Sequence, residues 1–273
     1  MGLLCAGIAA GVVYGTRLRT FNISTVTVTG GVTVDLAAVE RKVQSALDGS
    51  YFFLIPRRFS YTYPHDSIVS AAKEVTRVQD VVVERTGTAL SVIVTEYMPY
   101  ALWCKSIDSV EGDSHCLFVT EEGWAFAPAP SLRGAILLRY ATEGREPQVQ
   151  TMLAPADYMK ATRDFAAALA EKHGLSVSAI VETPDGDVRY RLRGGGELLL
   201  KRDADIGDVL GNLGALLSSD EFKHISTDGF VYIDLRFGDK VFVKESKDEI
   251  EQTGSASTTA TTTTVSVPVR TTE

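Results

Sequence analysis

The chain has 273 residues, 45% of them hydrophobic, a net charge of −8 at pH 7 and a pI of about 5.1. This length allows one or two domains. The acidic balance argues against a protein that binds nucleic acid, because such binding needs a basic surface to replace counterions. The pairs Arg57–Arg58 and Lys201–Arg202 stand apart from each other and are typical of solvated surface charge.

The chain begins with an apolar stretch, residues 2–14, that carries no charge. As a helix it covers about 20 Å, less than the membrane hydrocarbon core of about 30 Å. It fits a signal-peptide core without a basic start, a buried helix, or the outer part of a membrane helix whose beginning is missing. The polar residues Thr16–Thr20 favour the third, so we expect a transmembrane helix and its interfacial end over residues 1–20. Arg17 and Arg19 oppose the positive-inside rule, and the orientation therefore needs basic residues upstream.

Residues 21–99 follow the pattern of a β-α-α-β-β domain. The alternating run that ends at Gly30 predicts a first strand. Asp35 is the expected N-cap of a helix that stops at Gly49. The buried stripe of that helix is expected to be Leu36, Val39, Val43 and Leu47.

The second helix of this domain is expected to begin at Pro64–Asp66. The alternating runs 80–85 and 89–96 predict two strands joined by a turn at Thr86–Thr88. The short apolar insertion 51–56 is expected to fill the core.

Residues 100–245 predict a second, mostly antiparallel β-domain with two helices, over residues 155–172 and 206–217. Its closing hairpin is expected over 229–235 and 240–244. Residues 246–273 are rich in Ser and Thr and lack a core-forming pattern, which predicts a disordered tail. The predicted fold class is therefore α+β, with a membrane helix, two domains and a tail.

Cys104 and Cys116 flank a polar stretch that is typical of a hairpin loop. They can form a disulfide if their Cα atoms come within about 7 Å, which would suit an oxidising compartment. Two free, half-buried thiols fit the sequence equally well. Zinc is not expected, because no second Cys/His pair follows at ligand spacing.

No pattern in the sequence predicts catalysis. The histidines are expected in separate turns or helix ends, without the spacing of a triad. Gly194–Gly196 lacks the Lys-Ser/Thr of a phosphate loop. Acidic residues such as Asp203, Asp205 and Asp208 are typical of a helix start, and calcium would need more oxygen ligands than Asp185 and Asp187 supply. We therefore expect neither an enzyme nor a metal or cofactor site.

The last predicted strand, Lys240–Lys244, is the main candidate for a binding surface. Val241 and Val243 are expected on one face and Phe242 on the other. A terminal strand often lies at a sheet edge, where it can accept a strand from a partner. Lys240 and Lys244 can equally be residues that keep the edge unpaired.

The first domain is similar to a POTRA (polypeptide-transport-associated) domain in four motifs: Val26–Gly30, Tyr51–Leu54, Val81–Arg85, and Val92–Glu96 with Pro99. The second domain has three further motifs: Pro99–Trp103, Val119–Gly123 with Phe126, and the final hairpin Tyr232–Arg236 with Lys240–Lys244. In the order of these motifs the chain resembles the FtsQ/DivIB family of bacterial cell-division proteins. The resemblance covers roughly residues 3–245.

The resemblance implies a non-catalytic scaffold of the division complex. It implies a single-pass protein of the inner membrane at the septum, with its bulk outside the cytoplasm. FtsB/FtsL-like single-span proteins are the implied partners, bound through the last strand. The implied binding residues are Arg202, Tyr232, Phe237, Asp239, Lys240, Val241, Phe242, Val243 and Lys244.

Two alternatives stay open. The chain can be another POTRA protein, one that handles polypeptides for an outer-membrane assembly or secretion system, although its Thr-rich tail is unlike a transmembrane barrel. Tyr232 and Asp234 can also be ordinary hairpin residues, with Asp234 and Arg236 pairing across the turn.

Overall fold

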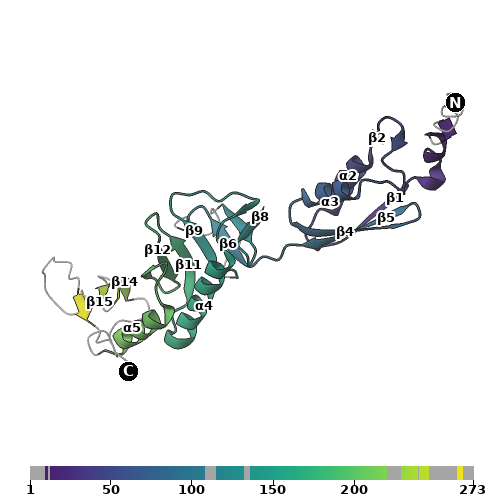
Figure 1. The fold of residues 1–273 in the computed structure, drawn as a ribbon. Helices are drawn as coiled ribbons and strands as arrows, with labels where there is room; N and C mark the ends of the chain where they lie inside the picture. The colour runs from purple at the N-terminus through teal and green to yellow at the C-terminus, as the bar shows by residue number, and fades with distance from the viewer. Residues whose placement is uncertain are drawn as a thin grey trace, which may run out of the picture. The chain divides into compact units, whose positions relative to one another are not determined.

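The computed structural model describes residues 10–11, 13–107, 115–131, 136–219, 229–238, 240–245 and 263–266. The chain divides into two compact units, residues 1–98 and 99–273. Both combine helices with β-sheet, as in an α+β fold (Figure 1).

Unit 1 has a three-stranded sheet in the order β1-β5-β4, with a small separate hairpin. β1 runs parallel to β5, and β5 runs antiparallel to β4. The helices α2 and α3 lie on one face of this sheet (Figure 1). The elements in chain order are η1 (Arg19–Phe21), β1 (Thr25–Gly30), α2 (Leu36–Leu47), β2 (Ser50–Tyr51), β3 (Ile55–Pro56), α3 (His65–Lys73), β4 (Val78–Thr86) and β5 (Ala89–Glu96).

The core of unit 1 follows from helical and strand periodicity. The Asp35 side chain accepts a hydrogen bond from the Ala38 N–H at 2.9 Å and starts α2. The residues of the α2 stripe at positions 39, 43 and 47 are fully buried against the sheet. The other buried members of this core include Ile68, Ala72, Leu90, Val92 and Val94.

Glu96 fastens the turn between β1 and α2 to the end of β5. Its Oε2 accepts hydrogen bonds from the backbone N–H groups of Val32 at 2.8 Å and Thr33 at 3.0 Å. Its Oε1 accepts from the Thr33 hydroxyl and, at 3.4 Å, from Arg77 Nη1. Burial raises the pKa of this carboxyl, but the hydrogen bonds from Thr33, Val32 and Arg77 outweigh burial and bring the pKa to about 2.

Glu96→Gln should destabilise unit 1 by about 1–3 kcal/mol near neutral pH, because it removes charge-assisted hydrogen bonds. The carboxyl's pKa is lower in the folded state than its ordinary value of 4.5. The contribution of the ionised Glu96 carboxylate to the stability of unit 1 is therefore present above pH 4.5 and is lost as the pH falls toward about 2. Urea unfolding followed by far-UV circular dichroism checks this, and a difference that stays constant down to low pH contradicts it. Both tryptophans lie in unit 2, so the Trp fluorescence transition is the internal control.

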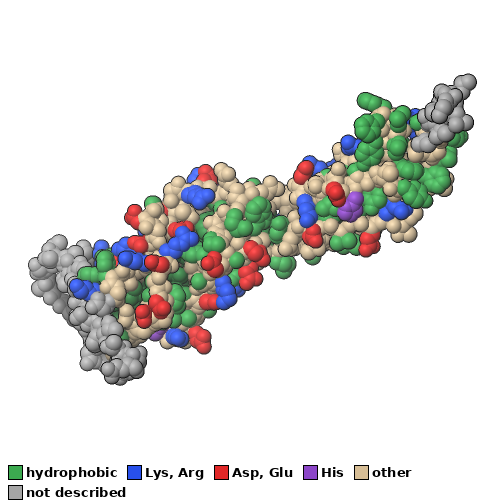
Figure 2. Space-filling view, in the orientation of Figure 1, with side chains coloured by type: hydrophobic (Ala, Val, Ile, Leu, Met, Phe, Trp, Pro, Cys, Tyr) green, Lys and Arg blue, Asp and Glu red, His purple; other side chains and the backbone are tan. Residues whose placement is uncertain are grey.

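The insertion after α2 does not fill the core, contrary to the sequence prediction. It forms the β2–β3 hairpin, and Phe52 and Phe53 at its tip are 91% and 90% exposed. Figure 2 shows hydrophobic side chains gathered over this part of unit 1. Both phenylalanines adopt positive φ angles, 49° and 63°, in the tip. Hydrophobicity alone therefore did not predict burial here.

The double substitution Phe52→Ser/Phe53→Ser should change the free energy of unfolding of unit 1 by less than about 0.5 kcal/mol, as for exposed sites in general. Leu47→Ala, at a position with no exposed surface, should cost about 2–5 kcal/mol. Urea unfolding of the two variants by circular dichroism compares them directly. A large loss in the serine variant would mean that the tip packs in solution.

The N-terminal segment corrects a sequence prediction. No helix among the described residues is long and apolar enough to span a membrane. The described helical residues before Arg17 are 10–11 and 13–16, whereas a span needs about 20 apolar residues. The transmembrane helix predicted over residues 1–20 is therefore not supported, nor is the single-pass inner-membrane location that rested on it. Residues 1–9 lie outside the described part of the chain.

Unit 2 is built on a large mixed sheet. Its strand order in the described residues is β10-β8-β7-β6-β9-β11-β12-β13-β14-β15-β16. The β6–β9, β9–β11 and β13–β14 pairs are parallel, and the other described pairs are antiparallel. The strands are β6 (Ala101–Cys104), β7 (Cys116–Val119), β8 (Trp124–Pro128), β9 (Arg139–Thr142), β10 (Thr151–Met152), β11 (Val177–Glu182), β12 (Asp187–Leu192), β13 (Glu197–Lys201), β14 (Phe230–Phe237), β15 (Lys240–Glu245) and β16 (Thr263–Ser266).

Two helices, α4 (Ala156–His173) and α5 (Ile206–Ser218), pack on this sheet through one hydrophobic cluster. Phe165 of α4 is fully buried, and its ring meets Tyr190 of β12 edge-on at a centroid distance of 4.9 Å. α5 contributes Val209, Leu213 and Leu216 to the same cluster, which also contains buried residues of β14 and β15. The last hairpin is therefore anchored in the core of unit 2.

Cys104 and Cys116 are directly opposite each other on β6 and β7 and form a disulfide. The bond lies at the base of the loop that connects the two strands. Of the two alternatives left by the sequence, the structure has the bonded one.

Candidate partner-binding strand

Seven of the nine predicted binding residues lie on the hairpin of β14 and β15. The two strands pair antiparallel, with Tyr232 opposite Lys244, Asp234 opposite Phe242 and Phe237 opposite Lys240. The register shifts between Asp234 and Phe237, where β14 contains an irregularity. Gly238 follows in the turn with a φ of 64°, and its carbonyl accepts a hydrogen bond from Asn212 Nδ2 of α5 at 3.0 Å.

β15 has one face in the core and one toward solvent. Val241 is fully buried and Val243 is 1% exposed, both within the hydrophobic cluster of unit 2. Lys240 and Lys244 are exposed, and Phe242 is half-buried between them. This alternation holds the strand in place with its valines and presents a lysine, an aromatic ring and a second lysine on the outer face.

Aromatic contacts order the outer face of the hairpin. The Phe242 ring meets the ring of Phe237, which is 52% exposed, edge-on at a centroid distance of 5.3 Å. The Lys244 Nζ lies 5.9 Å from the centre of the Tyr232 ring, within the range of a cation–π interaction. Figure 2 shows basic and hydrophobic side chains side by side at this end of unit 2.

A network of two carboxylates and one guanidinium braces β14 from within. Arg236 Nε and Nη2 donate to the two carboxylate oxygens of Asp234 at 2.9 and 2.7 Å. Arg236 Nη1 donates to Asp187 Oδ2, at the start of β12, at 2.6 Å. These hydrogen bonds, the one to Asp234 first, raise the pKa of Arg236. Asp234 and Arg236 thus pair along one strand and not across the turn, and they tie β14 to β12.

The edge position predicted for β15 is corrected by the structure. Residues 263–266 form β16, which pairs antiparallel with β15 in the register Lys240–Ser266 to Val243–Thr263. β15 therefore lies between β14 and β16, and β16 is the last strand in the order. This strand belongs to the segment predicted as a disordered tail. The rest of that segment, 246–262 and 267–273, lies outside the described residues.

Two predicted binding residues are not placed on this hairpin. Arg202, just after β13, forms an ion pair with Glu182 of β11, and its guanidinium lies 4.6 Å from the centre of the Tyr158 ring of α4. β11 lies on the other side of β13 from β15, so these contacts direct Arg202 away from β15. Asp239 lies outside the described residues.

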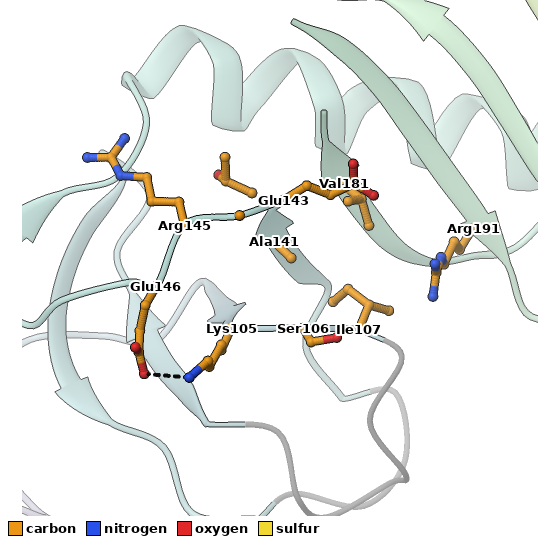
Figure 3. A pocket seen from close by; sticks show the side chains of 11 residues that line it. Lys105, Ser106, Ile107, Ala141, Glu143, Arg145, Glu146, Val181 and Arg191 are labelled. Atoms are coloured by element: carbon orange, nitrogen blue, oxygen red, sulfur yellow. Dashed lines mark ion pairs between the residues drawn. The ribbon is translucent and has the colours of Figure 1, made fainter. Parts of the chain in front are cut away.

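A pocket of about 470 Å³ opens beside β9 and β11, away from this hairpin (Figure 3). Its wall includes Ala141 and Val181, which are neighbours in the sheet. Lys105 and Glu146 lie side by side in the lining and form an ion pair at 3.3 Å, while Arg145 points outward. Arg191, also in the wall, pairs with Glu197 at 2.7 Å.

One of the acidic residues around α5, Asp205, is its N-cap. The Asp205 side chain accepts a hydrogen bond from the Asp208 N–H at 3.0 Å and caps α5. Within the described residues, no group of three or more His, Cys, Asp and Glu side chains is placed to hold a metal ion.

Sequence reasoning missed two contributors to the hairpin's surroundings. The sequence presents Asp187 only as an oxygen ligand too few for calcium, whereas in the structure it accepts a hydrogen bond from Arg236, two strands away. β16 was missed because Thr-rich composition outweighed the short β-branched run Thr263–Val265, which favours a strand. A scan against protein-family models finds no match for the chain, and a comparison with curated proteins finds no similar sequence.

Proposed function

We propose that this chain is a non-catalytic scaffold of the FtsQ/DivIB type, which binds FtsB/FtsL-like partners of the bacterial division complex by strand addition to β15. The observation that carries the proposal is the pairing of β15 with β16. β15 takes up a strand that comes from far along the chain, through a register of four residues. A backbone that pairs with one added strand in this way is suited to pair with a partner strand in its place.

The side chains of the hairpin supply the specificity that backbone pairing lacks. Phe242 and Phe237 form an aromatic pair that an incoming side chain can cover. Lys240 and Lys244 place positive charge on a chain whose net charge is −8. This local reversal of charge favours an acidic partner strand and faster association with it.

The order of the elements adds support from the rest of the chain. Unit 1 has the β-α-α-β-β order of a POTRA domain, with the β2–β3 hairpin inserted between its helices. A second β-rich unit follows from Pro99. The resemblance in sequence motifs and this order together favour the division scaffold over a POTRA protein that handles polypeptides.

The test is capture of partners from membrane extract of the source cell by the full chain. Three baits are compared: wild type, Phe242→Ala, and Phe52→Ala as the matched control for loss of a phenyl ring at an exposed site of unit 1. Wild type and Phe52→Ala should capture FtsB/FtsL-like coiled-coil division proteins, identified by mass spectrometry. Phe242→Ala should capture roughly tenfold less, which corresponds to about 1.4 kcal/mol.

Equal capture by all three baits would contradict binding at β15. Capture of nascent outer-membrane chains or barrel proteins would favour the polypeptide-handling alternative. The Trp fluorescence transition of each bait verifies that unit 2 is folded, since Trp103 and Trp124 both lie there.

A further inference from the structure

The partner-binding side of β15 is occupied in the structure by the chain's own strand β16. β16 covers Lys240–Val243 in antiparallel register, which is most of β15. Residues 246–262 connect the two strands in sequence. An edge that is covered in this way cannot pair with a second strand at the same residues, because each backbone N–H and C=O of the edge has one neighbouring strand to bond.

The composition of β16 makes it a weak occupant. Its sequence, Thr-Thr-Val-Ser, contains one aliphatic residue and no aromatic residue. In the described sheet it has a neighbouring strand on one side only, and it pairs with that strand through four residues. Its advantage is that it is tethered, which gives it a high effective concentration at β15.

We infer that β16 is an exchangeable strand that closes the β15 edge in cis, and that a partner binds by displacing it with an antiparallel strand of its own. This inference rests on the proposed function and adds the orientation of the incoming strand and the step that must precede its binding. An edge that is closed nine-tenths of the time weakens the apparent affinity of a partner about tenfold. A partner strand must therefore bind β15 strongly enough to displace β16.

Amide hydrogen exchange on the full chain tests whether β16 closes the edge. Alternate amides of β15 point toward β16 and the others toward β14. In the variant Thr264→Pro/Val265→Pro, which cannot maintain the ladder, the amides that face β16 should exchange at least tenfold faster than in wild type. Those that face β14 should keep their protection. Thr258→Pro/Thr259→Pro, in the same segment but outside β16, is the matched control and should exchange like wild type.

A second arm tests whether the edge takes a strand in trans. The probe is a synthetic peptide with the sequence of residues 259–270, added in excess to the Thr264→Pro/Val265→Pro variant. It should restore protection of the amides that face β16, while the same peptide with both prolines should not.

Three outcomes would overturn the inference. They are unchanged exchange in the Thr264→Pro/Val265→Pro variant, no restoration by the peptide, and protection in wild type that depends on protein concentration, since the last would place the strand of a second copy on β15. The proposed function fails separately. It fails if the opened variant still captures no FtsB/FtsL-like protein from extract.

Discussion

Arg236→Met is expected to lower the free energy of unfolding of unit 2 by about 3–5 kcal/mol, the cost of leaving one member of a buried ion pair without its partner. The Asp234 side chain is 8% exposed and receives two hydrogen bonds from the Arg236 guanidinium, besides one from the Arg236 backbone N–H at 3.1 Å that the substitution leaves in place. Methionine fills a similar space but donates nothing, so the carboxylate stays buried without its cation. The link from β14 to Asp187 of β12 is lost in the same variant.

Urea unfolding followed by Trp fluorescence measures this loss, because both tryptophans report on unit 2. Arg236→Lys is the control. It keeps the positive charge but cannot donate two parallel hydrogen bonds to one carboxylate, so it should lose clearly less stability than Arg236→Met. Equal losses in the two variants would mean that charge contributes nothing at this position.

Removal of the Cys104–Cys116 disulfide by the double substitution Cys104→Ser/Cys116→Ser is expected to cost unit 2 about 3 kcal/mol. The bond closes a loop with a sequence separation of 12 residues. In the chain-entropy account, an unfolded chain without this restraint gains conformational freedom of about that size. Trp103 is buried and adjacent to Cys104, so its fluorescence follows the affected strand closely.

A reducing agent should shift the urea transition of wild type toward that of the serine variant and leave the variant itself unchanged. Thiol titration of the denatured protein counts the free cysteine thiols and so tests the disulfide independently. One free thiol, that of Cys5, is expected before reduction and three after it, because the chain has three cysteines. Three thiols without reductant would show that the bond does not form.

Local spacing accounts for much of unit 1. The α2 stripe at positions 39, 43 and 47 is both evident in the sequence and buried in the structure, since a single face of one helix defines it. The two strands after α3 are likewise specified by alternation and by a short turn. These features depend on residues that are close together in the sequence. The periodicity of hydrophobic residues reports on such local relations.

Features that depend on distant partners could not be predicted in the same way. Phe52 and Phe53 have the composition of a core segment, but their exposure is set by the turn that the hairpin makes. The pairing of β15 with β16 joins segments separated by residues 246–262, and the sequence of neither strand specifies which strand it pairs with. Arg202 was assigned by resemblance, and its ion pair with Glu182 arises from the order of strands in the sheet.

In the proposed mechanism, β16 and a partner strand compete for β15. The variant Lys240→Cys/Ser266→Cys tests it most directly, because these positions are opposite each other in the register of the two strands and a disulfide between them would lock β16 in place. The single variants control for each substitution, and wild type with and without reductant controls for the Cys104–Cys116 bond. The locked chain should capture at least about tenfold less FtsB/FtsL-like protein than the same chain after reduction, a difference of about 1.4 kcal/mol. Equal capture by the locked and reduced chains would contradict strand addition at β15.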